Sequence, residues 1–404
     1  MSIRSSTSSA RSSFNFPMVT AQEFLGACRE RGLGFFTGTP CSYLKPLING
    51  ALNDAALGFR DAVNEGDAVA LAAGAYLATG RPGVVMFQNS GLGNAVNALT
   101  SLNWPFRIPA LLIVTHRGEP GGPADEPQHE LMGAVTTALL ETMRVPWAAF
   151  PADAAGIGPA LERAQRHFAE QSLPFAFVMP HGAVEETPLT TKRPTAALGA
   201  REFAFAENLP LATDARATRA EALGALLAAK RPDDVVIATT GFMGRELYTL
   251  GDAVNQLYLV GAMGGASAVG LGLALLRPER RVIVADGDGA VLMRMGNLAM
   301  VGAHAPRNLL HLVLDNEAHD STGAQATLSR GVAFGAIAQA CGYTRAVGTD
   351  SLEVLAAELA VHSVQSGPTL VHFRTRTGTL AKLGRPKISP CEAKLRLMQF
   401  LGHP

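Results

Sequence analysis

Short apolar runs alternate with longer helical patterns along most of the chain. Five runs in the first half predict β-strands: residues 34–37, 58–63, 83–87, 110–114 and 175–179. Stretches between them, such as 67–79 and 152–170, carry the periodicity of helices. Strands that alternate with helices are typical of parallel α/β sheets. The first half of the chain is therefore expected to form one such sheet.

A second series of strands is predicted at residues 235–239, 257–260, 282–285, 310–314, 343–347 and 369–373. Between the two series the periodicity fades and prolines such as Pro188, Pro194 and Pro210 accumulate, which indicates a linker. The expected fold class is α/β, with two Rossmann-like domains whose parallel sheets are flanked by helices. We expect a disordered tail at 1–16, a first domain at 17–185, a linker at 186–214 and a second domain at 215–404.

Composition favours a soluble enzyme of two domains. The chain has 404 residues, of which 48% are hydrophobic and 17% charged, so two large cores can form. Thirty-four basic residues balance thirty-four acidic ones, which argues against a nucleic-acid or anionic-membrane surface. The four cysteines show no CxxC spacing, so we expect neither a disulfide scaffold nor a zinc site. Free cysteines are typical of a reducing compartment, so we expect a cytoplasmic location. The sequence contains no apolar run of membrane-spanning length.

Polar residues follow two strands of the second half. One strand runs into Gly287-Asp288-Gly289, and the next ends before Asn316, with twenty-six residues between Gly289 and Asn316. The carboxyl ends of neighbouring parallel strands are where α/β sheets bind ligands. Two glycines allow close approach to a phosphate, while Asp and Asn offer the hard oxygens that Mg²⁺ prefers. An isolated GDG is usually only a turn, but this arrangement resembles the thiamine diphosphate (ThDP) signature.

The first half offers a second carboxylate, Glu65, where a strand ends and a helix begins. An isolated glutamate there is most simply a helix-start residue favoured by the macrodipole. However, the loop Gln88–Asn94 also follows a strand and opens a helix, so both segments are expected at one sheet edge. ThDP chemistry needs a carboxyl group that shares a proton with the pyrimidine ring. Glu65 is the first-half candidate for that task.

Several longer motifs resemble the phosphonopyruvate decarboxylase family, in which sulfopyruvate decarboxylase is the nearest relative. They are residues 39–46, 64–66, 88–97, 117–120, 125–129, 321–325 and 383–386, and the similarity extends from about residue 17 to the C-terminus. The family combines a pyrimidine-binding domain with a diphosphate-binding domain, the ThDP-binding fold. One departure from the family pattern is Cys41, where many relatives carry Asp.

The resemblance implies roles for matching residues. Glu65 would activate the pyrimidine, and the Ser90–Asn94 loop, through Ser90, Gly91 and Asn94, would approach the cofactor. Met263 would hold ThDP in its bent form, although a buried core methionine is the simpler interpretation. The expected Mg²⁺ ligands are Asp288, Asn316 and the backbone carbonyl of Ala318, and the expected diphosphate-lining residues are Gly287, Gly289 and Ala290.

The substrate implied by the family carries a carboxylate and a phosphonate, so its pocket needs cationic donors. Arg117 and His129 flank a loop rich in glycine and proline, and Lys45 lies near Ser42 in another strand-end loop. His319 follows the metal-binding segment and could face the thiazolium ring. A solvated surface position is the simpler interpretation for any single one of these cations. The remaining candidates are Ser321 and Thr322, which could instead cap a turn.

The implied reaction is decarboxylation of phosphonopyruvate to phosphonoacetaldehyde and carbon dioxide in phosphonate (antibiotic) biosynthesis. The alternatives are sulfopyruvate decarboxylation and ThDP-dependent carboligation. A non-catalytic two-domain binding protein would leave Glu65, Asp288 and Asn316 without a purpose. The family also implies a homo-oligomer, at least a dimer, whose active sites lie between subunits, because Glu65 and Asp288 must contact one ThDP molecule from different domains.

Overall fold

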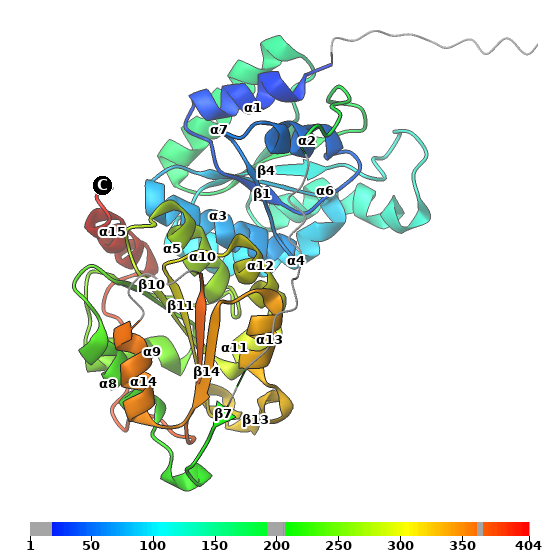
Figure 1. The fold of residues 1–404 in the computed structure, drawn as a ribbon. Coiled ribbons are helices and arrows are strands. Elements are labelled where there is room, and N and C mark those ends of the chain that lie inside the picture. The colour runs from blue at the N-terminus through cyan, green and yellow to red at the C-terminus, as the bar shows by residue number, and fades with distance from the viewer. Residues whose placement is uncertain (1–17, 192–204, 206, 362–366, 404) are drawn as a thin grey trace, which may run out of the picture.

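Two parallel β-sheets, one in each half of the chain, form the centres of two stacked α/β units (Figure 1). The computed structural model describes residues 18–191, 205, 207–361 and 367–403. The expected tail at 1–16 and residues 192–204 of the expected linker lie outside the described residues. The α/β fold class with helix-flanked parallel sheets is confirmed.

The first sheet has the strand order β2-β1-β3-β4-β6-β5, and its strand pairs are parallel. Strands β3 and β4 lie at its centre and are buried along their whole length, as expected for a sheet covered on both faces. The strands are β1 (Phe36–Gly38), β2 (Phe59–Asp61), β3 (Gly83–Phe87), β4 (Ala110–Thr115), β5 (Trp147–Ala149) and β6 (Phe175–Met179). The helices of this half are α1 (Ala21–Glu30), α2 (Lys45–Asn53), α3 (Glu65–Thr79), α4 (Leu92–Ala98), α5 (Trp104–Phe106), α6 (Glu130–Thr142) and α7 (Ala154–Gln171).

The second sheet has the order β7-β14-β15-β11-β10-β8-β9 and is also parallel. Its strands are β7 (Glu207–Asn208), β8 (Val235–Ala238), β9 (Gln256–Tyr258), β10 (Val282–Gly287), β11 (Leu309–Asp315), β14 (Arg345–Thr349) and β15 (Thr369–Arg374). A separate short ribbon pairs β12 (Ala318–His319) with β13 (Gln325–Ala326). The helices are α8 (Arg219–Ala229), α9 (Phe242–Leu250), α10 (Ala266–Leu276), α11 (Asp288–Met293), α12 (Gly296–His304), α13 (Phe334–Cys341), α14 (Leu352–Val361) and α15 (Pro390–Phe400).

Two strands of these sheets were not predicted from the sequence. β5 is a short edge strand that is only partly buried, and its apolar residues follow Pro146 in a run too short to predict a strand. β7 has two exposed residues and lies inside the expected linker at 186–214, yet it pairs with β14. The later part of that segment therefore extends the second sheet.

Helices α3 and α10 lie between the two sheets and contact each other backbone to backbone (Figure 1). A Cβ atom on Gly74 would lie 2.0 Å from the carbonyl oxygen of Val269, and one on Gly272 would lie 2.1 Å from that of Leu71. Only glycine fits at these points. The two helices belong to one continuous hydrophobic core that joins the halves of the chain.

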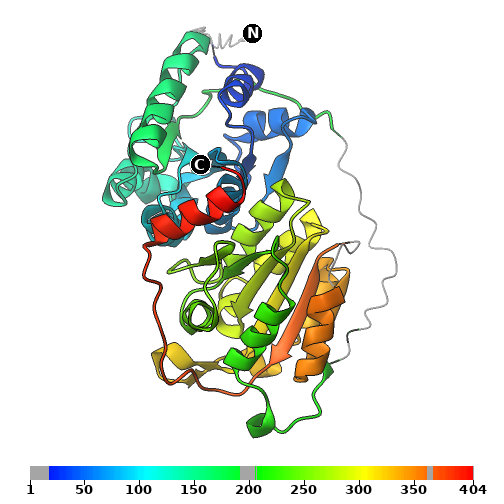
Figure 2. The ribbon, with the colours of Figure 1, turned by 90° about the vertical axis from the view of Figure 1, so that its left-hand side faces the viewer.

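The C-terminal helix α15 returns to the first half (Figure 2). It contacts α3 and α5 of that half as well as β9. The Lys394 ammonium group donates to the Arg107 carbonyl at 2.9 Å, and the Lys394 side chain is buried. Among the described helices, none is long and apolar enough to cross a membrane.

Replacing Gly74 with Ala should force α3 and α10 apart. We expect a loss of about 1–3 kcal/mol in the free energy of unfolding, the usual cost of overpacking a core. The matched control is Gly26→Ala in the middle of α1, where a Cβ would meet nothing within 4 Å; it should stabilise by about 0.5–1 kcal/mol. Denaturant unfolding of both variants measures this, and equal midpoints would contradict the backbone contact.

Candidate active site

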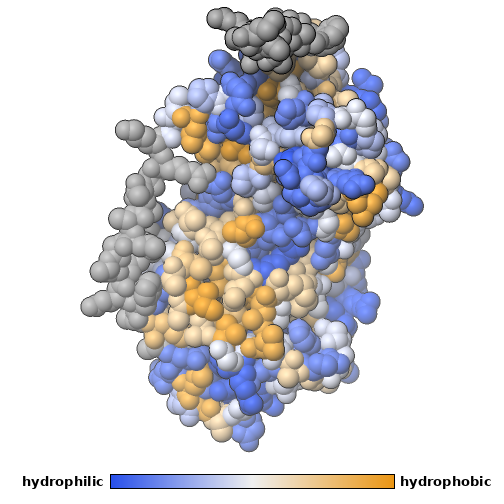
Figure 3. All heavy atoms as spheres, turned by 90° about the vertical axis from the view of Figure 1, so that its right-hand side faces the viewer, coloured by the Kyte–Doolittle hydropathy of each residue, from blue (hydrophilic) through white to orange (hydrophobic). Residues whose placement is uncertain are grey.

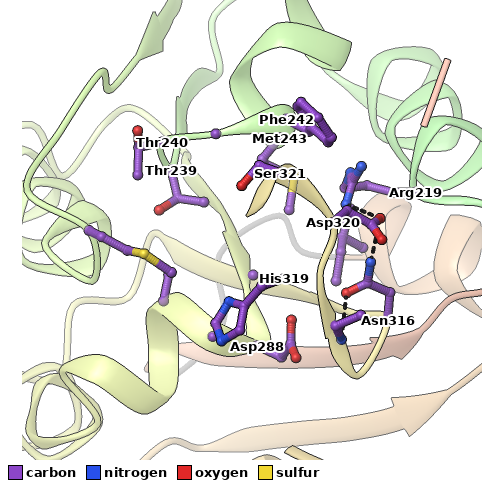
Figure 4. Close-up of a pocket in the computed structure, with 17 residues that line it drawn as sticks. Arg219, Thr239, Thr240, Phe242, Met243, Asp288, Asn316, His319, Asp320 and Ser321 are labelled. Atoms are coloured by element: carbon purple, nitrogen blue, oxygen red, sulfur yellow. Dashed lines mark hydrogen bonds and ion pairs between the residues drawn. The ribbon is translucent and has the colours of Figure 1, made fainter. Parts of the chain in front are cut away.

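The expected diphosphate–metal site lies at the carboxyl ends of three neighbouring strands. β10 pairs with β11 on one side and with β8 on the other, so the residues that follow these strands meet at one sheet edge. They line a cavity of about 70 Å³ (Figure 4). Its walls include Thr239, Thr240, Gly241, Met263, Gly287, Asp288, Gly289, Ala290, Asn316, Ala318, His319, Asp320 and Ser321.

Asp288 begins α11 and is 4% exposed. The Thr327 hydroxyl donates to its Oδ2 atom, which fixes the orientation of the carboxylate. Burial, and after it the negative charge of Asp315, raise the pKa of Asp288 above its ordinary value. A cation bound nearby would therefore stabilise the ionised form of the buried Asp288 carboxyl group.

Asn316 follows β11 and is also buried. Its Nδ2 atom donates to Asp320 at 2.7 Å, and its Oδ1 atom accepts from the Ala318 backbone N–H at 3.2 Å (Figure 4). Residues 316–320 thus form a tight loop at the cavity wall. Asp288, Asn316 and Ala318, which were expected to bind one metal ion, line the same cavity.

These residues fit a divalent cation held jointly with a diphosphate. No group of three His, Cys, Asp or Glu side chains among the described residues could hold a metal ion by itself. Asp288, the Asn316 amide and the Ala318 carbonyl offer hard oxygens of the kind Mg²⁺ prefers, and phosphate oxygens commonly supply the others. Open space surrounds the missing Cβ of Gly287, so a phosphate can approach the backbone there.

The turn around Gly289 also positions two expected residues. A Cβ on Gly289 would lie 2.6 Å from Cε1 of His319 and 3.5 Å from the terminal methyl of Met263. Both side chains therefore sit over the start of α11, and both line the cavity. Ser321 lines it too, whereas the Thr322 hydroxyl donates to Gln325 at 2.9 Å and closes a local turn.

The second carboxylate site is built around Glu65 at the start of α3. The Asn64 side chain caps this helix by accepting from the Gly66 N–H at 2.9 Å. Glu65 itself accepts from Thr39 Oγ1 at 3.0 Å and from Asn94 Nδ2 at 2.8 Å. A Cβ on Gly91 would lie 2.4 Å from the Glu65 side chain, so the 88–94 loop approaches the carboxylate as expected.

Arg117, an expected substrate residue of the first half, contacts both a carboxylate and uncharged side chains. Arg117 donates from Nε to Asp125 at 2.6 Å and from Nη1 to Ser42 at 3.1 Å, and its guanidinium lies over the Tyr43 ring. The hydrogen bond from Arg117 holds the pKa of Asp125 well below its ordinary range, so most of the Arg117 charge is compensated.

Three further candidates of the first half differ in their surroundings. Lys45 is exposed and forms an ion pair with Glu186 at 2.7 Å. His129 is buried, and its Nδ1 atom has no hydrogen-bond partner among the described residues. Ser90 is exposed, and its hydroxyl accepts from Gln88 Nε2 at 2.5 Å. Among these three, only His129 keeps a buried polar atom available.

Several cavity residues were not expected from the sequence. Arg219 donates to Asp320 at 3.3 Å and to Glu246 at 2.6 Å. The chain after β15 closes over this group, because the Gly378 N–H donates to Asp320 at 3.2 Å and the Leu380 N–H donates to Glu246 at 3.0 Å. These residues lie outside any short motif, and the only local signal is the helix start that Thr218 caps.

Glu65 lies outside the cavity that holds Asp288. Every residue that lines the diphosphate–metal cavity belongs to the range 219–321, and Glu65 is not among them. The cavity volume of about 70 Å³ is also far below the roughly 300–1,000 Å³ typical of cofactor pockets. This cavity by itself is therefore too small to hold a whole cofactor.

Comparison with known protein families identifies the class. Residues 18–136 match the thiamine pyrophosphate enzyme N-terminal TPP binding domain, and residues 239–373 match the C-terminal TPP binding domain. The structure of benzoylformate decarboxylase from Polynucleobacter necessarius superposes with a TM-score of 0.66 over 90% of this chain and 100% of that chain, at 13% identity. This likeness concerns the fold alone.

Curated relatives narrow the class. A phosphonopyruvate decarboxylase from Streptomyces viridochromogenes is 46% identical over 387 residues, 96% of each chain, and one from Streptomyces hygroscopicus is 45% identical over 96% of this chain and 95% of its own. A sulfopyruvate decarboxylase from Methanosarcina acetivorans is 29% identical over 92% of this chain and 95% of its own. The chain therefore belongs to the phosphonopyruvate decarboxylase family of ThDP-dependent carboxy-lyases.

Replacing Asp288 with Asn should weaken metal-dependent cofactor binding by more than about tenfold, since the amide removes the charge that would hold the cation. Calorimetric titration of ThDP, with and without Mg²⁺, measures the effect. The matched control is Asp233→Asn at an exposed position, which should bind as the unaltered protein does. An unchanged ThDP affinity of the Asp288 variant would remove Asp288 from the site.

Proposed function

We propose that this protein decarboxylates 3-phosphonopyruvate to phosphonoacetaldehyde and carbon dioxide, with ThDP and Mg²⁺ as cofactors. The observation that carries the proposal is the pairing of Asp288 and Asn316 at one cavity, in a chain 46% identical over nearly its whole length to a phosphonopyruvate decarboxylase. Such a product belongs to phosphonate biosynthesis, which includes antibiotic pathways.

The bound cofactor would supply an electron sink for the electrons released when carbon dioxide leaves. Glu65 would share a proton with the pyrimidine ring, and its two hydrogen bonds from Thr39 and Asn94 hold the carboxylate in place for this. His319 and Met263 would pack against the cofactor from the other half-site, since both lie over the Gly289 turn.

The phosphonate and carboxylate of the substrate require donors at the mouth of the site. Arg117 donates to Ser42 and can keep its hydroxyl oriented, while Asp125 compensates the positive charge of Arg117. Arg117 and Ser42 would therefore recognise the substrate anion through the geometry of their hydrogen bonds more than through net positive charge. His129, with its unpartnered buried Nδ1 atom, and His319 are the groups that could add a proton or a charge. Lys45 would have to leave Glu186 to take part.

Sulfopyruvate is the second candidate substrate, because a sulfopyruvate decarboxylase matches 92% of this chain. Its sulfonate carries one negative charge, whereas a phosphonate can carry two. Carboligation, in which the product carbon attacks a second carbonyl, would use the same cofactor groups. The lower identity of the sulfopyruvate relative, 29% against 46%, favours phosphonopyruvate.

The absence of Glu65 from the lining of the Asp288 cavity supports a shared active site. We propose a homo-oligomer in which Glu65 of one subunit faces the Asp288 cavity of another. Apolar residues gather on the second half of the molecule in Figure 3. Large exposed apolar side chains include Met293, Met295 and Leu328, with exposed fractions of 57%, 38% and 82%. Patches of this kind are typical of subunit interfaces.

Turnover of the two 2-oxo acids tests the function. With ThDP and Mg²⁺ present, the protein should release carbon dioxide from phosphonopyruvate with a kcat/KM at least about tenfold above that for sulfopyruvate. Glu65→Gln, which is nearly isosteric, should remain folded and lose this activity. Phosphonoacetaldehyde, measured by NMR, should account for the carbon. Preference for sulfopyruvate, or a ligated product, would replace the proposed function with the corresponding alternative.

Mixing two inactive variants tests the shared site. Glu65→Gln and Asp288→Ala damage different half-sites, so a mixed dimer would retain one intact site and recover about a quarter of the full activity after random exchange. Asp288→Ala mixed with Asn316→Ala is the control, because both changes affect the same half-site and no activity should return. Absence of recovery despite subunit exchange, verified by mass spectrometry of tagged chains, would place both residues in one site of one chain.

A further inference from the structure

Two buried carboxylates of like charge lie at the ends of neighbouring strands in the second half. Asp315 ends β11 and is fully buried, and Asp288, 4% exposed, follows β10, the strand that pairs with β11. Like charges in a buried site repel each other strongly. Some group must therefore hold the two carboxylates in fixed positions.

Thr327 and Ser329 contact these two carboxylates. The Thr327 hydroxyl donates to Asp288 and the Ser329 hydroxyl donates to Asp315 at 2.8 Å. The Ser329 backbone N–H donates to the Thr327 hydroxyl oxygen at 3.4 Å and links the two contacts. Both side chains are buried. They come from the segment between β13 and α13, outside the sheet edge that supplies Asp288 and Asn316.

Two side chains of β15 hold Asp315 in place. Asp315 accepts from His372 Nε2 at 2.8 Å and from Arg374 Nη1 at 2.7 Å, both on β15. Asp315 also accepts from the Glu317 backbone N–H at 2.9 Å. The anchor is therefore rigid, and Asp315 directly precedes Asn316, the other side chain of the proposed metal site.

We infer that Thr327 and Ser329 are positioning residues that hold Asp288 in its metal-binding orientation and tie it to the fixed Asp315 anchor. Hydrogen-bond partners of metal ligands set ligand orientation, and their loss typically weakens metal binding about 10- to 100-fold. Thr327 fixes one oxygen of Asp288 directly, while Ser329 fixes Asp315 with its hydroxyl and holds Thr327 with its backbone N–H. The inference rests on the proposed metal site and adds the residues that orient it.

The test compares Thr327→Val, which keeps the shape and removes the hydroxyl, with Thr327→Ser, which keeps the hydroxyl. Mn²⁺ binding in the presence of ThDP, followed by electron paramagnetic resonance, gives the metal affinity without reliance on turnover. Thr327→Val should bind the metal about 10- to 100-fold more weakly. Its kcat at saturating metal should stay within about twofold of the unaltered enzyme, and Thr327→Ser should restore the affinity.

The matched control is Thr142→Val, an exposed helix position whose hydroxyl donates only to the Ala138 carbonyl in the described structure; its metal affinity should not change. Ser329→Ala provides a second variant if Thr327→Val does not fold, and a several-fold loss of metal affinity is expected from it. A folded Thr327→Val or Ser329→Ala protein with unaltered metal affinity would overturn the inference. Absence of metal binding by the unaltered protein would instead overturn the proposed metal site.

Discussion

The close contact between α3 and α10 is the constraint on which the site depends. Gly74 and Gly272 let the two helix backbones touch, so the position of α3 relative to α10 is fixed by packing. Helix α3 begins at Glu65 and helix α10 begins just after the Met263–Gly264 turn, and both positions carry candidate site residues. A hydrogen-bond bridge joins these turns, because the Asn297 amide donates both to Asp67 and to the Gly264 carbonyl. Movement of one helix would displace both half-sites together.

The sequence predicted the fold wherever burial dictates the pattern. Apolar runs in the centre of a parallel sheet must be continuous, so strands such as β3 and β10 were predicted almost to the residue. The edge strands β5 and β7 were missed because β5 is an apolar stretch of only three residues and β7 consists of two exposed polar residues. The convergence of Asp288 and Asn316 was predictable because the strands before them are neighbours. Arg219 was not, since its place depends on tertiary contacts with Glu246 and Asp320.

Charge is handled differently in the two half-sites. Around Glu65, neutral donors from Thr39 and Asn94 satisfy one partly exposed carboxylate without compensating its charge. Around Asp288, Thr327 and Ser329 each donate to one of two buried carboxylates, and Arg374 donates to Asp315. The first arrangement is in keeping with the role proposed for Glu65. In the second, no ion pair joins Asp288 to a cationic side chain among the described residues, in keeping with the cation proposed for this site.

Helix α15 follows the second half in sequence but packs against the first half. The polypeptide passes from the first half to the second and then back, where Lys394 and His403 hydrogen-bond to carbonyl groups of Arg107 and Ala78. The halves are therefore held by packing and hydrogen bonds, and the covalent connection before β7 mainly raises their effective concentration. A gene divided at that connection would encode two fragments that can reassemble into the same architecture. The C-terminal helix of the second fragment would hold the two together by packing against the first.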